Sequence, residues 1–316
     1  MKVSIIVPVY NVAPYLKRCL DSIARQTFRD FEVVAVDDGS TDGSAEILDG
    51  YEADFPLMRI HQPNQGVSMA RNRAFGAAHG ELVAFLDSDD AIHPRLLEWT
   101  VSALESSDSD FVVYDYSEIR NCELKRLLAD WSADDMSPTV EPLPGTPFDW
   151  FLSTHRVPSP WQFLFRRADL PAEPFADDIA IYEDVPFVFG FLARAGKGVR
   201  IGKSLYGYAV MERSQSHHSP LDKRMDGIAS GARLLRSCLD ERQYRRYAGG
   251  KCASWIMDIW HEIRALPDGA EQRKSMAAFD AFLVRLMRDG LIRLGDFKMS
   301  RRWRVLASLI RNGVRG

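Results

Sequence analysis

Short apolar runs alternate with segments of helical periodicity along the first 115 residues. The apolar runs, which are typical of buried strands, cover residues 3–7, 32–36, 58–61, 82–86 and 111–114. The segments with helical spacing follow Pro14, pass through Ile47 and Leu48, and cover residues 66–78 and 96–104. Because strands and helices alternate, we predict an α/β fold with a Rossmann-like, mostly parallel sheet and helices on both faces.

The alternation ends near residue 120. Residues 121–160 hold six prolines and little periodicity, which indicates an insertion or a long connection. From residue 221 onward the spacing predicts helices over residues 225–239, 247–263 and 276–287. We therefore expect a main domain over residues 1–220 and a helical C-terminal region over residues 221–316.

Residues 299–316 form a basic segment at the C-terminus. From Arg301 to Arg311 the segment carries several arginines and no acidic residue, and Trp303, Leu306 and Ile310 can share one helical face. This pattern is typical of an interfacial helix on an anionic membrane surface. A terminal helix that packs on the domain, or one that joins two copies in a homo-oligomer, fits the pattern as well.

The overall composition limits the partners and the compartment. A net charge of -4 argues against a surface that binds nucleic acid without sequence preference. The four cysteines, Cys19, Cys122, Cys238 and Cys252, form no CxxC pair and are expected to be free thiols of a reducing compartment. Without a signal-peptide pattern or a long apolar stretch, the protein is expected in the cytoplasm, with peripheral membrane attachment open.

Three aspartates follow directly on the apolar run at residues 82–86. Asp87, Asp89 and Asp90 are separated only by Ser88, and they come at the strand end where open α/β sheets bind ligands. Carboxylates crowded in this way repel one another unless a cation neutralises them. A hard divalent ion such as Mn2+ or Mg2+, with substrate phosphates as further ligands, satisfies this need. The alternative is a loop of acids that serves only solubility.

Four ordered motifs resemble those of family 2 glycosyltransferases, which have the type A fold. The motifs are SIIVPVYN at residues 4–11, VDDGSTDGS at 36–44, NQGVSMARN at 64–72 and FLDSDD at 85–90. The resemblance implies that residues 1–220 bind a nucleotide-sugar, most simply a UDP-sugar, and transfer the sugar with inversion and with a metal. The implied acceptor is a hydroxyl of a glycan or lipid-linked molecule in bacterial cell-surface polysaccharide synthesis, such as lipopolysaccharide or capsule.

The resemblance assigns the nucleotide base to the ends of the first two strands. Asp38 is expected to accept a hydrogen bond from the ring N–H of uracil. Pro8, Val9 and Tyr10 are expected to wall the base, with Tyr10 offering a stacking face. The alternative role for Asp38 is a cap on the helix that follows its strand.

The diphosphate and the sugar are expected to lie near the third and fourth motifs. Arg71 has a fork geometry that suits paired phosphate oxygens, although an ion pair with Asp87 or Glu81 is the alternative. The neighbouring Ser68 is expected to cap its helix rather than to bind a ligand.

Within the acidic motif the resemblance separates the roles. Asp89 is expected to hold the metal, Asp87 to reach the donor ribose or sugar as well as the metal, and Ser88 to lie beside the donor. Asp90, which precedes Ile92 and Pro94, is expected to cap a helix. His217 is a further candidate ligand of the metal.

An acidic pair at Glu183–Asp184 resembles the segment that carries the catalytic base in this family. Inverting transfer is a single displacement, so a carboxylate must remove the acceptor proton. Asp184 is the expected base, with Glu183 beside it, and Asp177 and Asp178 are the rival acids. The alternative is that the pair only begins a helix and interacts with its dipole.

The acceptor side of the site is less clearly marked. Trp161 is a candidate floor for an acceptor sugar, with core packing as the alternative, and Arg213 is a candidate to close over the diphosphate. Gln162 and Phe163 stand where the family often has Asn and Lys.

Three other classes of protein share parts of this pattern. A dehydrogenase is excluded because PVYN at residues 8–11 replaces the glycine-rich turn that a dinucleotide needs. A nucleotidyltransferase and a catalytically inactive nucleotide-sugar-binding protein stay open as alternatives.

Overall fold

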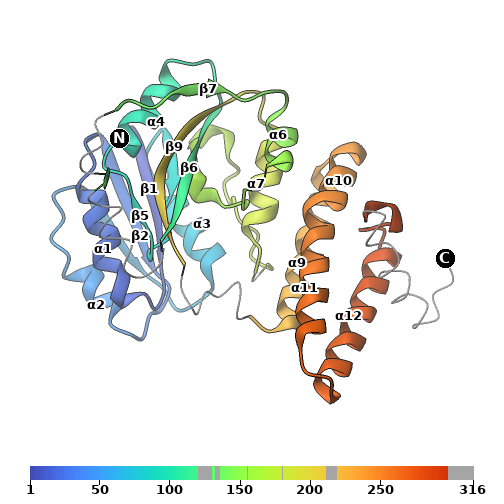
Figure 1. The fold of residues 1–316 in the computed structure, drawn as a ribbon. Coiled ribbons are helices and arrows are strands. Elements are labelled where there is room, and N and C mark those ends of the chain that lie inside the picture. Colours follow the sequence, from blue (N-terminus) through green and yellow to red (C-terminus); the bar gives the residue numbers. More distant parts are fainter. Residues whose placement is uncertain (120–129, 132–135, 155, 180, 211–218, 298–316) are drawn as a thin grey trace. The chain divides into compact units, whose positions relative to one another are not determined.

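The computed structural model describes residues 1–119, 130–131, 136–154, 156–179, 181–210 and 219–297. The chain groups into two compact units. The first unit comprises residues 1–147, 158–177 and 194–214, and the second comprises residues 148–157, 178–193 and 215–316. The first unit is built on a sheet and the second on helices (Figure 1).

One mixed sheet forms the framework of the first unit, and the described residues contribute nine strands to it. The strands are β1 (Val3–Val9), β2 (Phe31–Asp37), β3 (Leu57–His61), β4 (Leu82–Phe85), β5 (Ala91–Ile92), β6 (Phe111–Ile119), β7 (Val140–Pro142), β8 (Phe163–Arg166) and β9 (Gly198–Ala209). Their order is β3-β2-β1-β4-β8-β6-β9-β5, and β7 pairs with β9.

The two halves of this sheet differ in direction. In the first half β3, β2, β1 and β4 are all parallel, which confirms the prediction from the alternating pattern. In the second half β8 runs antiparallel to both β4 and β6, and β5 and β7 run antiparallel to β9. The carboxyl ends of β1, β2 and β4 therefore meet at one edge of the sheet, where ligands of open α/β sheets bind.

Helices cover both faces of the parallel half, which explains why β1, β2 and β4 are buried along their whole length. On one face Ile5 and Val33 share a core with Leu20 of α1 (Ala13–Ala24) and with Leu97 of α4 (Leu96–Glu105). Alternate residues point to the other face, where α3 (Val67–Ala77) packs on β1 and β2. A short helix, α2 (Ser44–Asp49), follows β2.

The second unit is helical, as predicted for the C-terminal region. Its helices are α6 (Pro147–Ser153), α7 (Asp184–Leu192), α9 (Leu221–Cys238), α10 (Glu241–Tyr247), α11 (Ala253–Ala265) and α12 (Ala270–Arg288). Helices α9, α11 and α12 pack side by side (Figure 1). The helix predicted over residues 247–263 is confirmed in α11, and a π-helical turn at Ala248–Cys252 joins α11 to α10 without a break in the helical backbone. This turn contains Gly249 and Gly250, whose backbone freedom weakens a regular helix.

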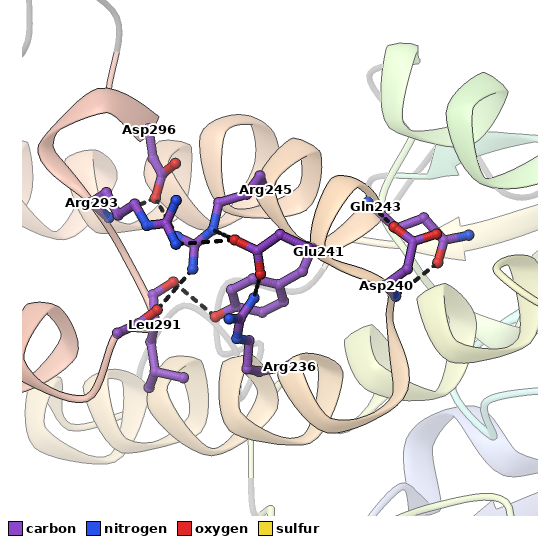
Figure 2. Close-up of polar contacts among 10 residues, drawn as sticks. Arg236, Asp240, Glu241, Gln243, Arg245, Leu291, Arg293 and Asp296 are labelled. Atoms are coloured by element: carbon purple, nitrogen blue, oxygen red, sulfur yellow. Dashed lines mark hydrogen bonds and ion pairs between the residues drawn. The ribbon is translucent and has the colours of Figure 1, made fainter.

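An ion-pair network fastens the segment after α12 to α10 (Figure 2). Glu241 accepts hydrogen bonds from Arg236, from Nε of Arg245 at 3.0 Å and from Nη2 of Arg293 at 3.0 Å. Asp296 accepts from Nη1 of Arg245 at 3.3 Å and from the amide of Arg293 at 2.6 Å. Because Glu241, Arg236 and Arg293 are exposed, solvent screens their pairs, and the less exposed Arg245–Asp296 pair is the better shielded contact of the network.

The predicted interfacial helix at residues 299–316 lies outside the described residues and stays a prediction. Within the described part of the chain, no helix has both the length and the apolar character that crossing a membrane requires.

Candidate active site

Two loops interlock at the carboxyl ends of β1 and β2. Asn11 adopts a left-handed backbone with φ of 51°. Its amide donates to Oγ of Ser40 at 3.1 Å, and its side-chain oxygen accepts from the amide of Thr41 at 2.8 Å. Asp42 accepts from the amide of Ala13 at 3.0 Å, which satisfies an unpaired donor at the start of α1. The two loops therefore have a fixed shape before any ligand binds.

Asp38 lies buried at the end of β2, with 2% of its surface exposed. Its Oδ1 accepts from Nε2 of Gln62 at 2.7 Å and from the amide of Gln65 at 2.9 Å. Its Oδ2 accepts from the amide of Gly66 at 2.8 Å. The predicted alternative, a cap on the following helix, is wrong, because no side chain caps α2. Asp38 instead fastens the loop before α3 to the end of β2.

Gly39 allows this loop to approach Asp38 closely. Its φ is 73°, and a Cβ at this position would lie 2.8 Å from the backbone nitrogen of Asn64. Both the left-handed conformation and the close approach require a residue without a side chain.

The residues predicted to wall a base come together beside Asp38. Pro8 and Val9 end β1 opposite Val36 and Asp37 of β2, and the Val9 carbonyl accepts from the amide of Asp38 at 2.8 Å. Tyr10 follows with 40% of its surface exposed, which makes it one of the most exposed large apolar side chains among the described residues. An exposed aromatic residue directly after the strand that pairs with the end of β2 is an arrangement that suits a planar base.

Arg71 pairs with Asp87, which is one of the two partners that the sequence left open. Nη2 of Arg71 lies 2.8 Å from Oδ1 of Asp87, and the guanidinium stacks 5.1 Å from the centre of the Phe175 ring. The other proposed partner, Glu81, pairs with Lys2 at 3.0 Å. The Arg71 side chain is 3% exposed and that of Asp87 is 26% exposed, so the pair is fixed at the edge of the core.

The acidic loop after β4 is anchored by its last member. Oδ2 of Asp90 accepts from Oη of Tyr206 at 2.6 Å, and Oδ1 accepts from the amide of Ala209 at 2.6 Å. Oη of Tyr206 in turn accepts from the amide of Asp87 at 3.2 Å. The prediction that Asp90 caps a helix is wrong: the next residues form β5, which pairs with β9, so the carboxylate is buried against that strand.

The charged forms of Asp89 and Asp90 are disfavoured in this loop. Burial raises the pKa of Asp89 to about 6, and the charge of Asp87 adds to the rise. Burial raises the pKa of Asp90 well above its ordinary value, with the charges of Asp89 and Asp87 contributing. A cation next to Asp87 and Asp89 would relieve this repulsion.

The donor set of the loop fits a hard divalent ion that is completed by its substrate. Among the described residues no group of three or more His, Cys, Asp and Glu side chains is placed to enclose a metal. An ion held by one or two carboxylates plus phosphate oxygens and waters needs no such group. His217, the further predicted ligand, lies outside the described residues, as does Arg213.

Two smaller predictions concern serines of the first unit, and only that for Ser68 has an outcome, since the place of Ser88 beside the donor stays a prediction. Ser68 lies within α3, and no side chain caps that helix, whose N-cap is Gly66, so the predicted cap is wrong. Ser88 is buried between Asp87 and Asp89.

Trp161 packs inside the first unit, which is the alternative that the sequence left open. Its ring stacks on Tyr206 at 4.4 Å and on Tyr208 at 5.5 Å, and its carbonyl accepts from Oη of Tyr114 at 2.7 Å. With 3% of its surface exposed, Trp161 offers a ligand little area.

Glu183 and Asp184 lie at the start of α7 in the second unit. Asp184 is the first residue of the helix and Glu183 precedes it, so both carboxylates favour the positive end of the helix dipole. Glu183 is buried and Asp184 is partly exposed, whereas the rivals Asp177 and Asp178 are exposed. The choice of Asp184 as base stays a prediction.

Sequence reasoning missed three residues that shape these sites. Phe175 and Tyr206 lie far along the chain from Arg71 and Asp87, and no local pattern links them. Tyr182, with φ of 67°, carries no turn signal, since a left-handed tyrosine cannot be recognised from its neighbours.

Residues 4–170 match the family model described as "Glycosyl transferase family 2". The chain belongs to this family. It is 33% identical over 218 residues to the uncharacterized glycosyltransferase EpsJ of Bacillus subtilis (strain 168), which covers 65% of this chain but only 60% of that protein. It is 30% identical over 302 residues to the uncharacterized glycosyltransferase YibD of Escherichia coli (strain K12), covering 87% of this chain and 83% of YibD.

Solved structures similar to this chain show its fold. A crystal structure of S. aureus TarS 1–349 in complex with UDP aligns with a TM-score of 0.65 at 22% identity, covering 99% of this chain and 92% of that chain. A complex of the same protein with UDP-GlcNAc aligns with a TM-score of 0.62 at 20% identity. The predicted type A fold and the glycosyltransferase class are confirmed, and the alternatives to a glycosyltransferase are not favoured.

Proposed function

We propose that this protein transfers a sugar from a UDP-sugar, with inversion and with Mn2+ or Mg2+, to a hydroxyl of a glycan or lipid-linked acceptor in bacterial surface polysaccharide synthesis. One observation carries the proposal. Asp38, the Arg71–Asp87 pair and the acidic loop all lie at one edge of the parallel half of the sheet. The glycosyltransferase relatives EpsJ and YibD support the reaction class, and the UDP complexes of TarS support the donor.

The donor would be read in two parts. Asp38, whose position is fixed by three hydrogen bonds, keeps lone pairs that can accept the ring N–H of uracil, and Tyr10 would cover one face of the base. Asp87 and Asp89 would hold the metal and the sugar end of the donor. A bound divalent ion supplies Lewis-acid stabilisation of the charge on the departing diphosphate.

The displacement needs one proton acceptor. The acceptor hydroxyl gives its proton to the carboxylate of Asp184, and its oxygen forms a bond to the anomeric carbon. The bond from that carbon to the diphosphate oxygen breaks on the opposite side, and UDP leaves with the electron pair. General-base help of this kind is worth roughly 10²–10⁴-fold in rate.

The proposal includes the place where the enzyme binds its acceptor. A basic C-terminal segment at residues 299–316 would attach the enzyme to an anionic membrane surface and so to lipid-linked acceptors. Comparing the full chain with one that ends at residue 298 on vesicles of phosphatidylglycerol tests this extension, and equal binding of the two forms would reject it.

A panel of UDP-sugars tests the proposal as a whole. UDP release would be measured for UDP-glucose, UDP-galactose and UDP-N-acetylglucosamine, each with Mn2+ and with EDTA. We expect release from at least one donor that depends on Mn2+ and that falls sharply in Asp89→Ala. Release that is unaffected by EDTA would contradict the metal, and the absence of release from every UDP-sugar would contradict the donor class.

A further inference from the structure

Tyr182, directly before the acidic pair, has an unusual backbone. Its φ of 67° lies in the left-handed region, and among the described residues only one other non-glycine residue, Asn11, has a positive φ. Asparagine tolerates this region, whereas a bulky side chain such as tyrosine adopts it only when its surroundings impose it. Such residues gather at functional sites.

Two helices of the second unit impose this conformation. The Tyr182 ring lies parallel to the ring of Trp255 on α11, with centres 5.8 Å apart and an angle of 8° between the planes. Its hydroxyl accepts from Nε of Arg224 on α9 at 3.4 Å, and Arg224 also pairs with Glu262 of α11. The side chain is therefore held on α9 and α11 at once.

The backbone on the other side of the turn is held as closely. A Cβ on Gly227 of α9 would lie 2.4 Å from the carbonyl oxygen of Ile181 and 3.3 Å from Cδ2 of Tyr182. Only glycine lets α9 approach the chain this closely, because no real Cβ sits so near a backbone oxygen. Helix α9 therefore packs directly against the peptide that enters Tyr182.

The conformation of Tyr182 controls the first turn of α7. The carbonyl of Tyr182 accepts from the amide of Val185 at 3.1 Å, and the acidic pair lies between these two residues. A negative φ at Tyr182 would change the direction of the backbone at the start of α7. The side chain of Asp184 would then point elsewhere.

We propose that Tyr182 is a positioning residue, whose left-handed backbone, held by Trp255, Arg224 and Gly227, aims the carboxylate of Asp184. The inference rests on the proposed role of Asp184 as the base of the transfer. On this account the strained backbone of Tyr182 has a role, because packing within the second unit, and not the sequence of α7, determines the conformation of the first turn of α7.

A series at residue 182 separates positioning from packing. Tyr182→Gly loses the whole ring but adopts positive φ freely, and Tyr182→Val keeps more apolar volume but strongly disfavours positive φ. We expect Tyr182→Val to lower kcat by about 10²-fold, the scale of a misplaced catalytic group, with the KM for the UDP-sugar unchanged, and Tyr182→Gly to keep higher kcat than Tyr182→Val. The assay is release of UDP from the UDP-sugar that the wild type cleaves fastest, with thermal unfolding of each variant as a check of folding.

The opposite order would overturn the inference. A tyrosine that only packs predicts greater loss in Tyr182→Gly than in Tyr182→Val, in step with the unfolding temperature. Gly227→Ala disturbs the same turn while Tyr182 stays in place, and it should lower kcat as well. Its matched control is Gly231→Ala, one helical turn further on, where the new Cβ would lie an ordinary 3.8 Å from Cδ of Pro186.

The double variant of Tyr182→Val with Asp184→Asn distinguishes two errors: a wrong choice of Asp184 as base, and a wrong positioning role for Tyr182. If Tyr182 acts through Asp184, then Tyr182→Val should add almost nothing to the loss in Asp184→Asn. If Asp184→Asn alone retains wild-type kcat, the proposed base is wrong. If Asp184→Asn is impaired and Tyr182→Val still lowers its kcat by the full factor, the base stands and the positioning role is wrong.

Discussion

The two units hold their acidic side chains by different means. In the first unit the carboxylates of Asp38 and Asp87 are fixed by polar partners, namely backbone amides in one case and Arg71 in the other. In the second unit Asp184 follows a strained tyrosine that is held by ring stacking and by close packing on a glycine. Polar fixation leaves a motif in the sequence, whereas packing between helices far apart in the chain does not.

The largest effect is expected where one side chain carries the chemistry. Asp184→Asn should lower turnover by roughly 10²–10⁴-fold because the amide cannot take the acceptor proton. UDP affinity, measured by calorimetry, should be unchanged. An enzyme with near-normal turnover would move the base to another acid, and Asp177→Asn and Asp178→Asn are the variants to compare next.

Arg71→Ala should destabilise the first unit by about 3 kcal/mol, because it leaves Asp87 without its charge partner at the edge of the core and removes the contact with Phe175. The matched control is Arg73→Ala on the same helix, where the exposed guanidinium makes only a 3.5 Å contact with Gln62. Urea unfolding measures the free energy of unfolding of each variant. An equal loss in Arg71→Ala and Arg73→Ala would show that the ion pair with Asp87 does not stabilise the first unit.

Gly39→Ala should cost about 1–3 kcal/mol of unfolding free energy because the new Cβ would press on the backbone of Asn64 at a positive φ. Gly43→Ala shares the positive φ, yet its Cβ would meet nothing within 4 Å. The difference in unfolding free energy between the two variants measures the cost of the close contact with Asn64. No difference would mean that the loop before α3 can move away from Asp38.

The acidic loop should also give a pH dependence. An ordinary Asp has a pKa of about 3.9, and the raised pKa of about 6 at Asp89 means that the folded state binds this proton more tightly than the unfolded state. The contribution of Asp89 to stability is therefore full below about pH 4 and is lost as the pH rises through about 6. Urea unfolding from pH 4 to 7 should show a smaller decline for Asp89→Asn than for the wild type; parallel curves would contradict the shift.

The sequence predicted most of the first unit because its signals are local. Apolar runs marked β1, β2 and β4, and the order of the motifs predicted that Asp38, Arg71 and Asp87 lie at one edge of the sheet. Asp90 was misassigned because its partners are distant: it is buried by β9 rather than capping a helix. Distant partners also decided between the two roles left open for Trp161, which is covered by Tyr206 and Tyr208. Periodicity marked the helix over residues 247–263, but the π-helical turn within it leaves no signal in that spacing.

UDP binding in the presence and absence of Mn2+ is the most direct test of the central claim that the acidic loop holds a metal against a nucleotide diphosphate. Calorimetric titration of the wild type should show tighter binding of UDP with Mn2+ than with EDTA, and Asp89→Ala should remove that difference while leaving the weaker, metal-free binding in place. Equal UDP affinity of the wild type in Mn2+ and in EDTA would contradict the account.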